Sequence, residues 1–128
     1  MKTFNTTMGE LYDLEQSIIK AGVMNMSFSR KGSFSISRNM KKIANELEEY
    51  KTQRAELIKQ YSDGSDSIGP DSPHWAEFLT EFQSLSSVAT EISLNTIAQE
   101  DFPEEITPVT CVLLEFMLED EKEESKED

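Results

Sequence analysis

Residues 36–61 read ISRNMKKIANELEEYKTQRAELIKQY, and the spacing of their apolar side chains decides the fold. Side chains that are separated alternately by four and three positions lie on one stripe of an α-helix. The stripe here comprises Ile36, Met40, Ile43, Leu47, Tyr50, Arg54, Leu57 and Tyr61. The stretch is therefore predicted to form a long helix with a coiled-coil-like seam, in which Arg54 is the charged exception.

A second repeat of the same period follows a polar stretch at 62–73, SDGSDSIGPDSP, whose composition favours turns. Asp71 or Ser72 is predicted to cap this second helix, with Pro73 in its first turn. The repeat comprises Trp75, Phe78, Phe82, Leu85, Ala89 and Ile92. A connection of this length lets the two helices fold back on each other as an antiparallel hairpin.

In that hairpin Leu57 is expected to meet Phe78, and Arg54 falls level with Glu81 and Phe82. A guanidinium that is removed from water needs a carboxylate or an aromatic face. We therefore expect Arg54 to pair with Glu81, to stack on Phe82, or to extend along the seam until its head reaches solvent. The sequence leaves these three arrangements open.

Two shorter helices are predicted toward the ends of the chain. The first spans residues 7–21, because Thr7 and Glu10 have the spacing of a capping box and a broad apolar stripe follows. The second begins where Thr107 can cap a helix and Pro108 can occupy its first turn. Its expected buried face consists of Val109, Val112, Leu113, Phe116 and Met117.

Alternating apolar and polar residues at 2–6 and 91–97 favour two short strands that pair as a ribbon. Residues 23–37, VMNMSFSRKGSFSIS, fit a strand, a loop that inserts Met and Phe into a groove, or the early turns of the long helix. The predicted fold is mainly α: a long antiparallel helical hairpin with an N-terminal helix, a short C-terminal helix and a small two-stranded β ribbon. We expect one helical domain over 1–118 and a disordered acidic tail over 119–128.

Composition limits the functions that the chain can have. Its 128 residues include 25 acidic and 12 basic side chains, and the net charge of −13 argues against general coating of DNA. One cysteine and one histidine supply neither an internal disulfide nor a Cys/His zinc site. No stretch has the composition of a membrane span or an export signal, so we expect an intracellular protein without a membrane partner.

The charges are segregated, because residues 16–45 carry six cations and no acid, whereas residues 62–128 carry 18 acids and two cations. The basic patch consists of Arg30, Lys31, Arg38, Lys41 and Lys42. Serines, Phe28 and Phe34 between these cations would give single-stranded nucleic acid phosphate donors and a stacking face. Alternatively, the cations neutralise the acidic half of the chain, within one molecule or across a dimer, and the negative total charge favours this alternative.

The acidic half suggests a second kind of surface. Carboxylates on a rigid helical scaffold can imitate the phosphate spacing of a duplex and occupy a basic groove on a nucleic-acid enzyme. The members of this predicted acidic face are Glu77, Glu81, Glu91, Glu100, Asp101, Glu104 and Glu105. The competing interpretation is that the acidic surface only keeps the protein in solution.

Catalytic chemistry finds little support in the sequence. Cys111 and His74 would need a fortunate fold and a third orienting group to form a nucleophile pair, and we expect Cys111 to be a buried apolar side chain. Asp63, Asp66 and Asp71 lack the twelve-residue pattern of an EF-hand, and no Gly-rich phosphate loop is present. We therefore predict no catalytic, cofactor-binding or metal-binding residues.

Four stretches stand in a distinctive order: GELYDLEQSIIK at 9–20, SRNMKKIANELEEYKTQRAELIKQY at 37–61, HWAEFLTEFQSL at 74–85 and ITPVTCVLLEFML at 106–118. Their order resembles that in a family of small proteins from tailed phages and prophages of Gram-positive bacteria. The resemblance implies a phage origin, a helical fold and a location in the cytoplasm of the bacterial host. No catalytic residues carry over from it.

Together these features predict a non-enzymatic phage protein that binds another protein, with inhibition of a host defence or nucleic-acid-processing factor through the acidic face as the leading hypothesis. The alternative is a virion or tail assembly factor or chaperone, in which the seam and the Met/Phe segment bind a partner or a second copy. Nucleic-acid binding through residues 30–42 is the weakest of the three hypotheses.

Overall fold

The computed structural model describes residues 1–119, so the predicted tail lies outside the described residues apart from Glu119. The fold is mainly α, as predicted. In chain order its elements are strand β1 (Lys2–Thr7), helix α1 (Met8–Lys20), 3₁₀ turn η1 (Val23–Asn25), helix α2 (Arg30–Tyr61), helix α3 (Trp75–Ser86), strand β2 (Ala89–Leu94), 3₁₀ turn η2 (Gln99–Asp101), helix α4 (Pro108–Leu113) and 3₁₀ turn η3 (Glu115–Met117).

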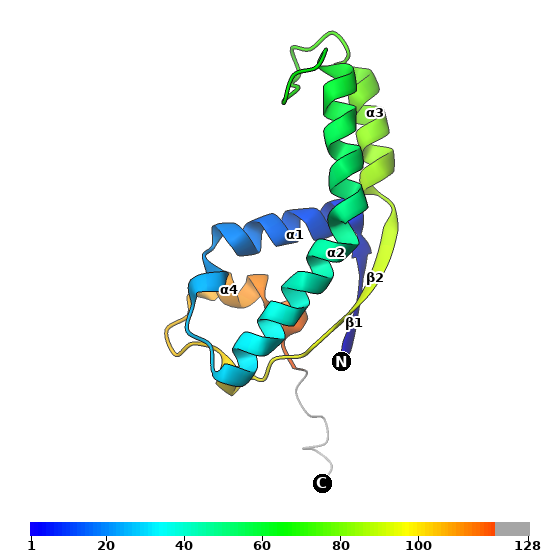
Figure 1. The fold of residues 1–128 in the computed structure, drawn as a ribbon. Helices are drawn as coiled ribbons and strands as arrows, with labels where there is room; N and C mark the ends of the chain where they lie inside the picture. The colour runs from blue at the N-terminus through cyan, green and yellow to red at the C-terminus, as the bar shows by residue number, and fades with distance from the viewer. Residues whose placement is uncertain (120–128) are drawn as a thin grey trace.

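Helix α2 runs the length of the molecule and divides it into two parts (Figure 1). Its first two thirds lie in a body that also contains α1, α4 and the two-stranded sheet. Its last third pairs with α3 to form a projecting hairpin, which we call the arm and define as residues 51–86. The predicted antiparallel helical hairpin is thus present, and about a third of α2 takes part in it.

The start of α2 resolves the alternatives that the sequence left open for residues 23–37. The hydroxyl of Ser29 accepts a hydrogen bond from the Gly32 amide at 3.0 Å, so the helix begins at Arg30, six residues before the apolar repeat. Residues 30–35 are therefore the early turns of the long helix, and 23–25 form the 3₁₀ turn η1. The loop alternative holds for the residues between them, because Met26 and Phe28 pack against the core. Helix α1 ends as expected before Gly22, whose φ of +76° is accessible to glycine.

Helix α3 is shorter than the repeat predicts. It ends at Ser86, and the last two members of the repeat, Ala89 and Ile92, belong to strand β2. Residues 89–94 form a strand rather than further helix because their backbone groups form hydrogen bonds with β1. The strand also buries Ile92 and Leu94 against the core. The predicted cap is also wrong: His74 precedes the first helical residue, and the Ser72 carbonyl instead closes a turn by accepting from the Trp75 amide.

The predicted β ribbon is confirmed. Strands β1 and β2 are antiparallel, in a register that runs from Lys2 opposite Leu94 to Thr7 opposite Ala89. The inner face of this ribbon carries Phe4 and Ile92, which lie opposite each other, and the outer face is polar. The second strand begins two residues earlier than expected and ends at Leu94.

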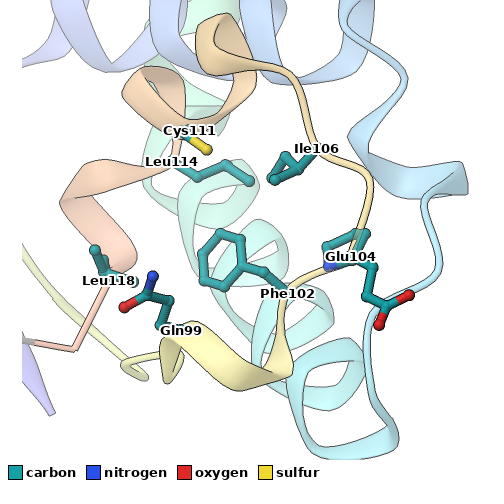
Figure 2. A pocket seen from close by; sticks show the side chains of 8 residues that line it. Gln99, Phe102, Glu104, Ile106, Cys111, Leu114 and Leu118 are labelled. Atoms are coloured by element: carbon teal, nitrogen blue, oxygen red, sulfur yellow. The ribbon is translucent and has the colours of Figure 1, made fainter.

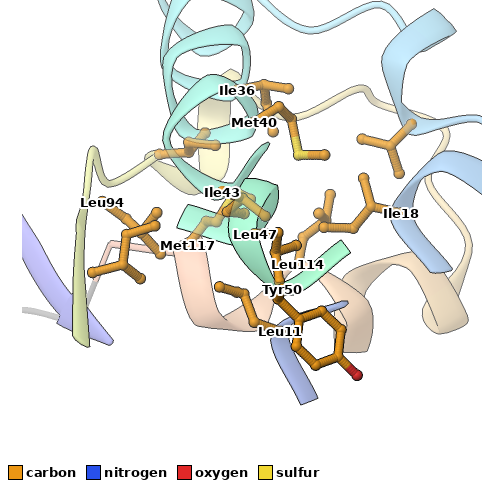
Figure 3. Packing of buried hydrophobic residues seen from close by; sticks show 13 residues of the cluster. Leu11, Ile18, Ile36, Met40, Ile43, Leu47, Tyr50, Leu94, Leu114 and Met117 are labelled. Atoms are coloured by element: carbon orange, nitrogen blue, oxygen red, sulfur yellow. The ribbon is translucent and has the colours of Figure 1, made fainter. Parts of the chain in front are cut away.

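The hydrophobic core lies in the body, on the inner side of the first half of α2 (Figure 3). Five consecutive seam positions of α2 are buried there against side chains from α1, β2 and η3. The buried cluster consists of Leu11, Ile18, Val23, Ile36, Met40, Ile43, Leu47, Tyr50, Ile92, Leu94, Ile97, Leu114 and Met117. The seam of α2 is thus occupied within its own chain rather than left free for a partner.

In the arm the two helices are held by aromatic contacts in the predicted antiparallel sense. The hydroxyl of Tyr50 lies 2.8 Å from that of Ser86, and the ring of Tyr61 lies edge-on to Phe78 with centroids 6.4 Å apart. Phe78 in turn stacks on Phe82 at 5.4 Å. The two contacts between the helices, Tyr50 with Ser86 and Tyr61 with Phe78, agree with the expected register to within about one helical turn.

Of the three arrangements that the sequence left open for Arg54, the structure shows stacking on aromatic rings. Its guanidinium carbon lies 4.7 Å from the centroid of the Tyr12 ring and 5.7 Å from that of Phe82. Glu81 is exposed and makes no ion pair within residues 1–119. The guanidinium therefore joins α1, α2 and α3 where the arm leaves the body.

Helix α4 begins as predicted, because the Thr107 hydroxyl accepts from the Thr110 amide at 3.3 Å and Pro108 is the first helical residue. Its predicted apolar face is confirmed only in part. Met117 is buried and Leu113 and Phe116 pack against the core, but Val109 and Val112 are 74% and 72% exposed, and Thr110 and Leu114 are buried as well. The helix ends at Leu113 and continues as the 3₁₀ turn η3, so the stripe that meets the core is rotated from the one that apolarity suggests.

Candidate functional site

The basic patch is a surface of α2 on the side opposite the core. Arg30, Lys31, Arg38 and Lys41 are exposed, and none of them makes an ion pair within residues 1–119. Lys42 differs, because its ammonium donates to the Ser93 carbonyl at 2.8 Å and so ties α2 to β2. Four of the five predicted cations are thus available to a partner.

An exposed phenylalanine lies within this patch. Phe34 is 60% exposed and stands on the helix one turn from both Arg30 and Arg38. Phe28, the other aromatic residue of the prediction, lies elsewhere, because its ring packs against Phe102 with centroids 5.5 Å apart. The patch therefore combines four cations with one aromatic face.

The charge on the exposed side of α2 changes from positive to negative further along the helix. Asn45, Glu48, Glu49 and Glu56 are exposed and continue the line that Phe34, Arg38 and Lys41 begin. The basic and acidic residues of α2 thus share one helix face, which the charge sums along the sequence do not show. The three- and four-residue spacing of these positions was the signal that would have shown it.

The predicted acidic face is not one surface. Glu77 and Glu81 are exposed on α3 in the arm, and Glu91 lies on the outer side of the ribbon opposite Asn5. Glu100, Asp101, Glu104 and Glu105 lie instead in and after η2, at the far end of the molecule beside the start of α2. The structure thus divides the predicted set into a group near the arm and a group at the opposite end.

Asp101 has a structural role at this opposite end. Its backbone carbonyl accepts from the Ser29 amide at 3.0 Å, and its carboxylate accepts from the Ser29 hydroxyl at 2.7 Å. Ser29 in turn caps α2, so Asp101 fixes the start of the long helix. Asp101 is therefore unsuited to be a free member of a binding face.

A pocket of about 400 Å³ lies between the segment 99–106, α4 and Leu118 (Figure 2). Phe102, Ile106 and Leu114 form much of its wall, and the sulfur of Cys111 lies close to Leu114. Cys111 is exposed, which corrects the prediction of a buried side chain. The pocket is an apolar hollow with the Gln99 amide and the Glu104 carboxylate near it.

The cysteine and the histidine are not brought together. His74 precedes α3 at the outer end of the arm, where its Nδ1 lies 3.1 Å from the Glu77 carboxylate, and Cys111 is in α4 in the body. Within residues 1–119 no group of three His, Cys, Asp or Glu side chains is arranged to hold a metal ion. In the same part of the chain no helix has both the length and the apolarity needed to cross a membrane.

Comparisons of the chain with known protein families, with curated proteins and with solved structures find no match.

Proposed function

We propose that this chain is a non-enzymatic, phage-encoded protein that binds a basic surface of another protein through the acidic side of its arm. The observation that carries the proposal is the position of Glu77 and Glu81, which are exposed on the element that projects furthest from the body. Glu91 extends the same charge to the base of the arm. A projecting element can enter a groove that the broad body cannot.

The charge balance of the arm supports this proposal. The arm contains six carboxylates and three cations. Lys51 is bound to the buried Glu15 of α1 at 2.8 Å, and Arg54 lies between two aromatic rings. Within the arm, which the structure describes throughout, Lys59 is the one cation without such a partner. The field around the arm is therefore negative and attracts a basic partner.

The class of partner follows from the same chemistry. A host factor that processes nucleic acid has a basic groove shaped for phosphates, and regularly spaced carboxylates on a rigid helix can occupy it. We therefore propose antagonism of such a factor in the cytoplasm of the bacterial host. The phage-like order of the sequence stretches supports this setting.

A pair of charge reversals with equal changes in net charge tests the proposal. Glu77→Lys/Glu81→Lys/Glu91→Lys alters the arm and its base, and Glu100→Lys/Glu104→Lys/Glu105→Lys alters the opposite end. Affinity capture from host lysate is expected to lose its specific partner with the first variant and to keep it with the second. An unchanged set of partners with the first variant, or equal losses with both, would contradict the proposal.

An assembly factor is the second candidate, and the exposure of Met24 favours it. Met24 is 51% exposed and Phe34 60%, so part of the Met/Phe segment is available to a partner, although the seam of α2 is buried. Tail or capsid genes beside the coding sequence would support this candidate. Neighbouring genes for inhibitors of host defence would support the first.

A further inference from the structure

The outer face of α2 carries opposite charges on its two halves. Moving along the helix, the exposed line consists of Phe34, Arg38, Lys41, Asn45, Glu49, Thr52 and Glu56. These positions are three or four residues apart, so they share one face of a 32-residue helix. The basic half and the acidic half meet at Asn45, whose side chain is polar but uncharged.

The charge pattern of this face is complementary to that of a second copy of the helix that runs in the opposite direction. Lys41 and Glu49 lie four residues before and after Asn45, so an antiparallel copy centred on Asn45 places each Lys41 opposite the partner's Glu49. A parallel copy would place like charges opposite each other. We infer that the outer face of α2 binds a second copy of this chain, antiparallel and related by a two-fold axis near Asn45.

The residue at the proposed axis suits this arrangement. A side chain on a two-fold axis meets its own copy, so any charge there would face an equal charge. The carboxamide of Asn45 both donates and accepts hydrogen bonds, and two such groups can therefore satisfy each other across the axis. Asn45 is also exposed in the single chain, which leaves its carboxamide accessible to a partner.

The two ends of this face of α2 also suit a second copy of the chain. In the antiparallel arrangement each exposed Phe34 lies level with the partner's Glu56, whose methylene groups, together with the neighbouring Ala55, can cover apolar surface that water now contacts. The reciprocal pairs of Lys41 with Glu49 lie between these apolar contacts and the axis. The dimer interface therefore has two apolar contacts, two ion pairs and a central pair of amides.

A second copy suits this face better than nucleic acid does. A phosphate backbone that follows the basic half would meet Glu49 and Glu56 when it continued along the helix. An antiparallel second copy instead pairs Lys41 of the basic half with Glu49 of the acidic half on both sides of the axis. The net charge of −13 on each molecule opposes association, so the dimer is expected to be weak and to depend on protein concentration.

Reciprocal charge exchange tests this interface. Lys41→Glu places carboxylates opposite each other, Glu49→Lys places ammonium groups opposite each other, and the double variant Lys41→Glu/Glu49→Lys restores the opposite-charge pairs. Sedimentation velocity over roughly 5–500 µM, a range that covers weak association, should show a wild-type dimer at the upper end. Each single variant should weaken the dimer by about tenfold or more, and the double variant should recover it.

Mixing provides the most selective measurement. An equimolar mixture of Lys41→Glu with Glu49→Lys should form a heterodimer, because both of its ion pairs are attractive, whereas each variant alone stays monomeric. Controls with equal changes in net charge are Lys20→Glu and Glu104→Lys, which lie outside the face and should leave the dimer unchanged. Circular dichroism should show that all variants keep their helix content.

Substitution at the axis tests the symmetry separately from the ion pairs. Asn45→Lys places two ammonium groups next to each other on the axis and should weaken the dimer, even though it lowers the net negative charge of each molecule. Asn45→Gln keeps the carboxamide and should leave the dimer close to that of the wild type. A dimer that is as strong with Asn45→Lys as with the wild type would contradict an axis at this position.

Three further results would overturn the inference. The first is a wild-type protein that stays monomeric at the highest concentration, and the second is a double variant or a mixture that fails to recover the dimer. The third is a monomer whose affinity for a single-stranded oligothymidylate falls with Lys41→Glu but not with Lys20→Glu, which would make the basic half a phosphate-binding surface. The inference uses residues of α2 alone, so its outcome does not depend on the acidic side of the arm.

Discussion

Arg54 shows how one polar residue can be accommodated in an apolar repeat. It occupies a seam position of α2, and its guanidinium lies between the rings of Tyr12 and Phe82. Its Nε atom is buried and has no hydrogen-bond partner within residues 1–119, so the two rings provide the main compensation for lost hydration. Sequence periodicity offered Phe82 as a neighbour, but Tyr12 could be placed only once α1 had been positioned.

Replacing Arg54 is expected to loosen the joint between the arm and the body. Arg54→Ala should lower the free energy of unfolding by about 1–2 kcal/mol, because two cation–π contacts and the packing of the stem are lost. Arg54→Lys should recover little of this, since an ammonium cannot lie flat between two rings. Urea denaturation measures the change, and Lys59→Ala, which is exposed on the same helix, is the control. Equal stabilities for wild type and Arg54→Ala would mean that the stacking contributes nothing.

At the scale of elements, two helical glycines mark the places where backbones approach closely. A Cβ atom at Gly9 would lie 2.7 Å from the Cβ of Ser86, where α1 meets the end of α3. A Cβ atom at Gly32 would lie 2.9 Å from the Asp101 carbonyl oxygen, where α2 meets η2. Both distances are shorter than van der Waals contact allows, so the packing of these elements depends on the missing side chain.

Gly32→Ala is therefore expected to destabilise the protein even though alanine favours helices. Helix propensity alone predicts a gain of about 1 kcal/mol, whereas the clash with the Asp101 backbone should cost roughly 1–3 kcal/mol. Gly69→Ala is the matched control, because no atom lies within 4 Å of a Cβ at that position. The midpoint of chemical denaturation should fall for the first variant and stay nearly constant for the second. A rise for Gly32→Ala would show that η2 can move away from α2 without cost.

At the scale of the whole molecule, burial is distributed unevenly between the body and the arm. The core cluster lies in the body and reaches only to Tyr50 along α2. Within the arm, all of which the structure describes, Phe78 is the one buried side chain. Two helices that pack mainly on each other bury little apolar area, so the arm depends on its contacts with the body for its stability.

Hydrogen exchange should reveal this difference. Amides of α3 are expected to exchange at least about tenfold faster than amides of residues 36–50, because the arm can open locally without disturbing the core. Mass spectrometry of peptides from the two regions measures the rates, and peptides from α1 provide an internal reference in the body. Equal protection in α3 and in residues 36–50 would show that the arm and the body unfold as one cooperative unit.

The features that the sequence alone determined are local ones. The long helix, the caps at Thr7 and Thr107 and the two strands of the ribbon depend on residues within a few positions of one another. Capping hydrogen bonds and side-chain periodicity act over about one turn, so they can be recognised without knowledge of the rest of the chain. The basic patch was recognisable for the same reason, because its cations are close in sequence.

Only the tertiary structure decided where contacts between distant segments override the local preference for a helix or a buried face. The repeat that begins at Trp75 continues to Ile92 by periodicity, but pairing with β1 ends the helix at Ser86. The buried side of α4, the exposure of Cys111 and the separation of Glu77 from Glu104 likewise depend on which distant segments pack together. Burial is a property of contacts between segments that are remote in sequence, so the periodicity of one segment can indicate a buried face but not which distant segment covers it.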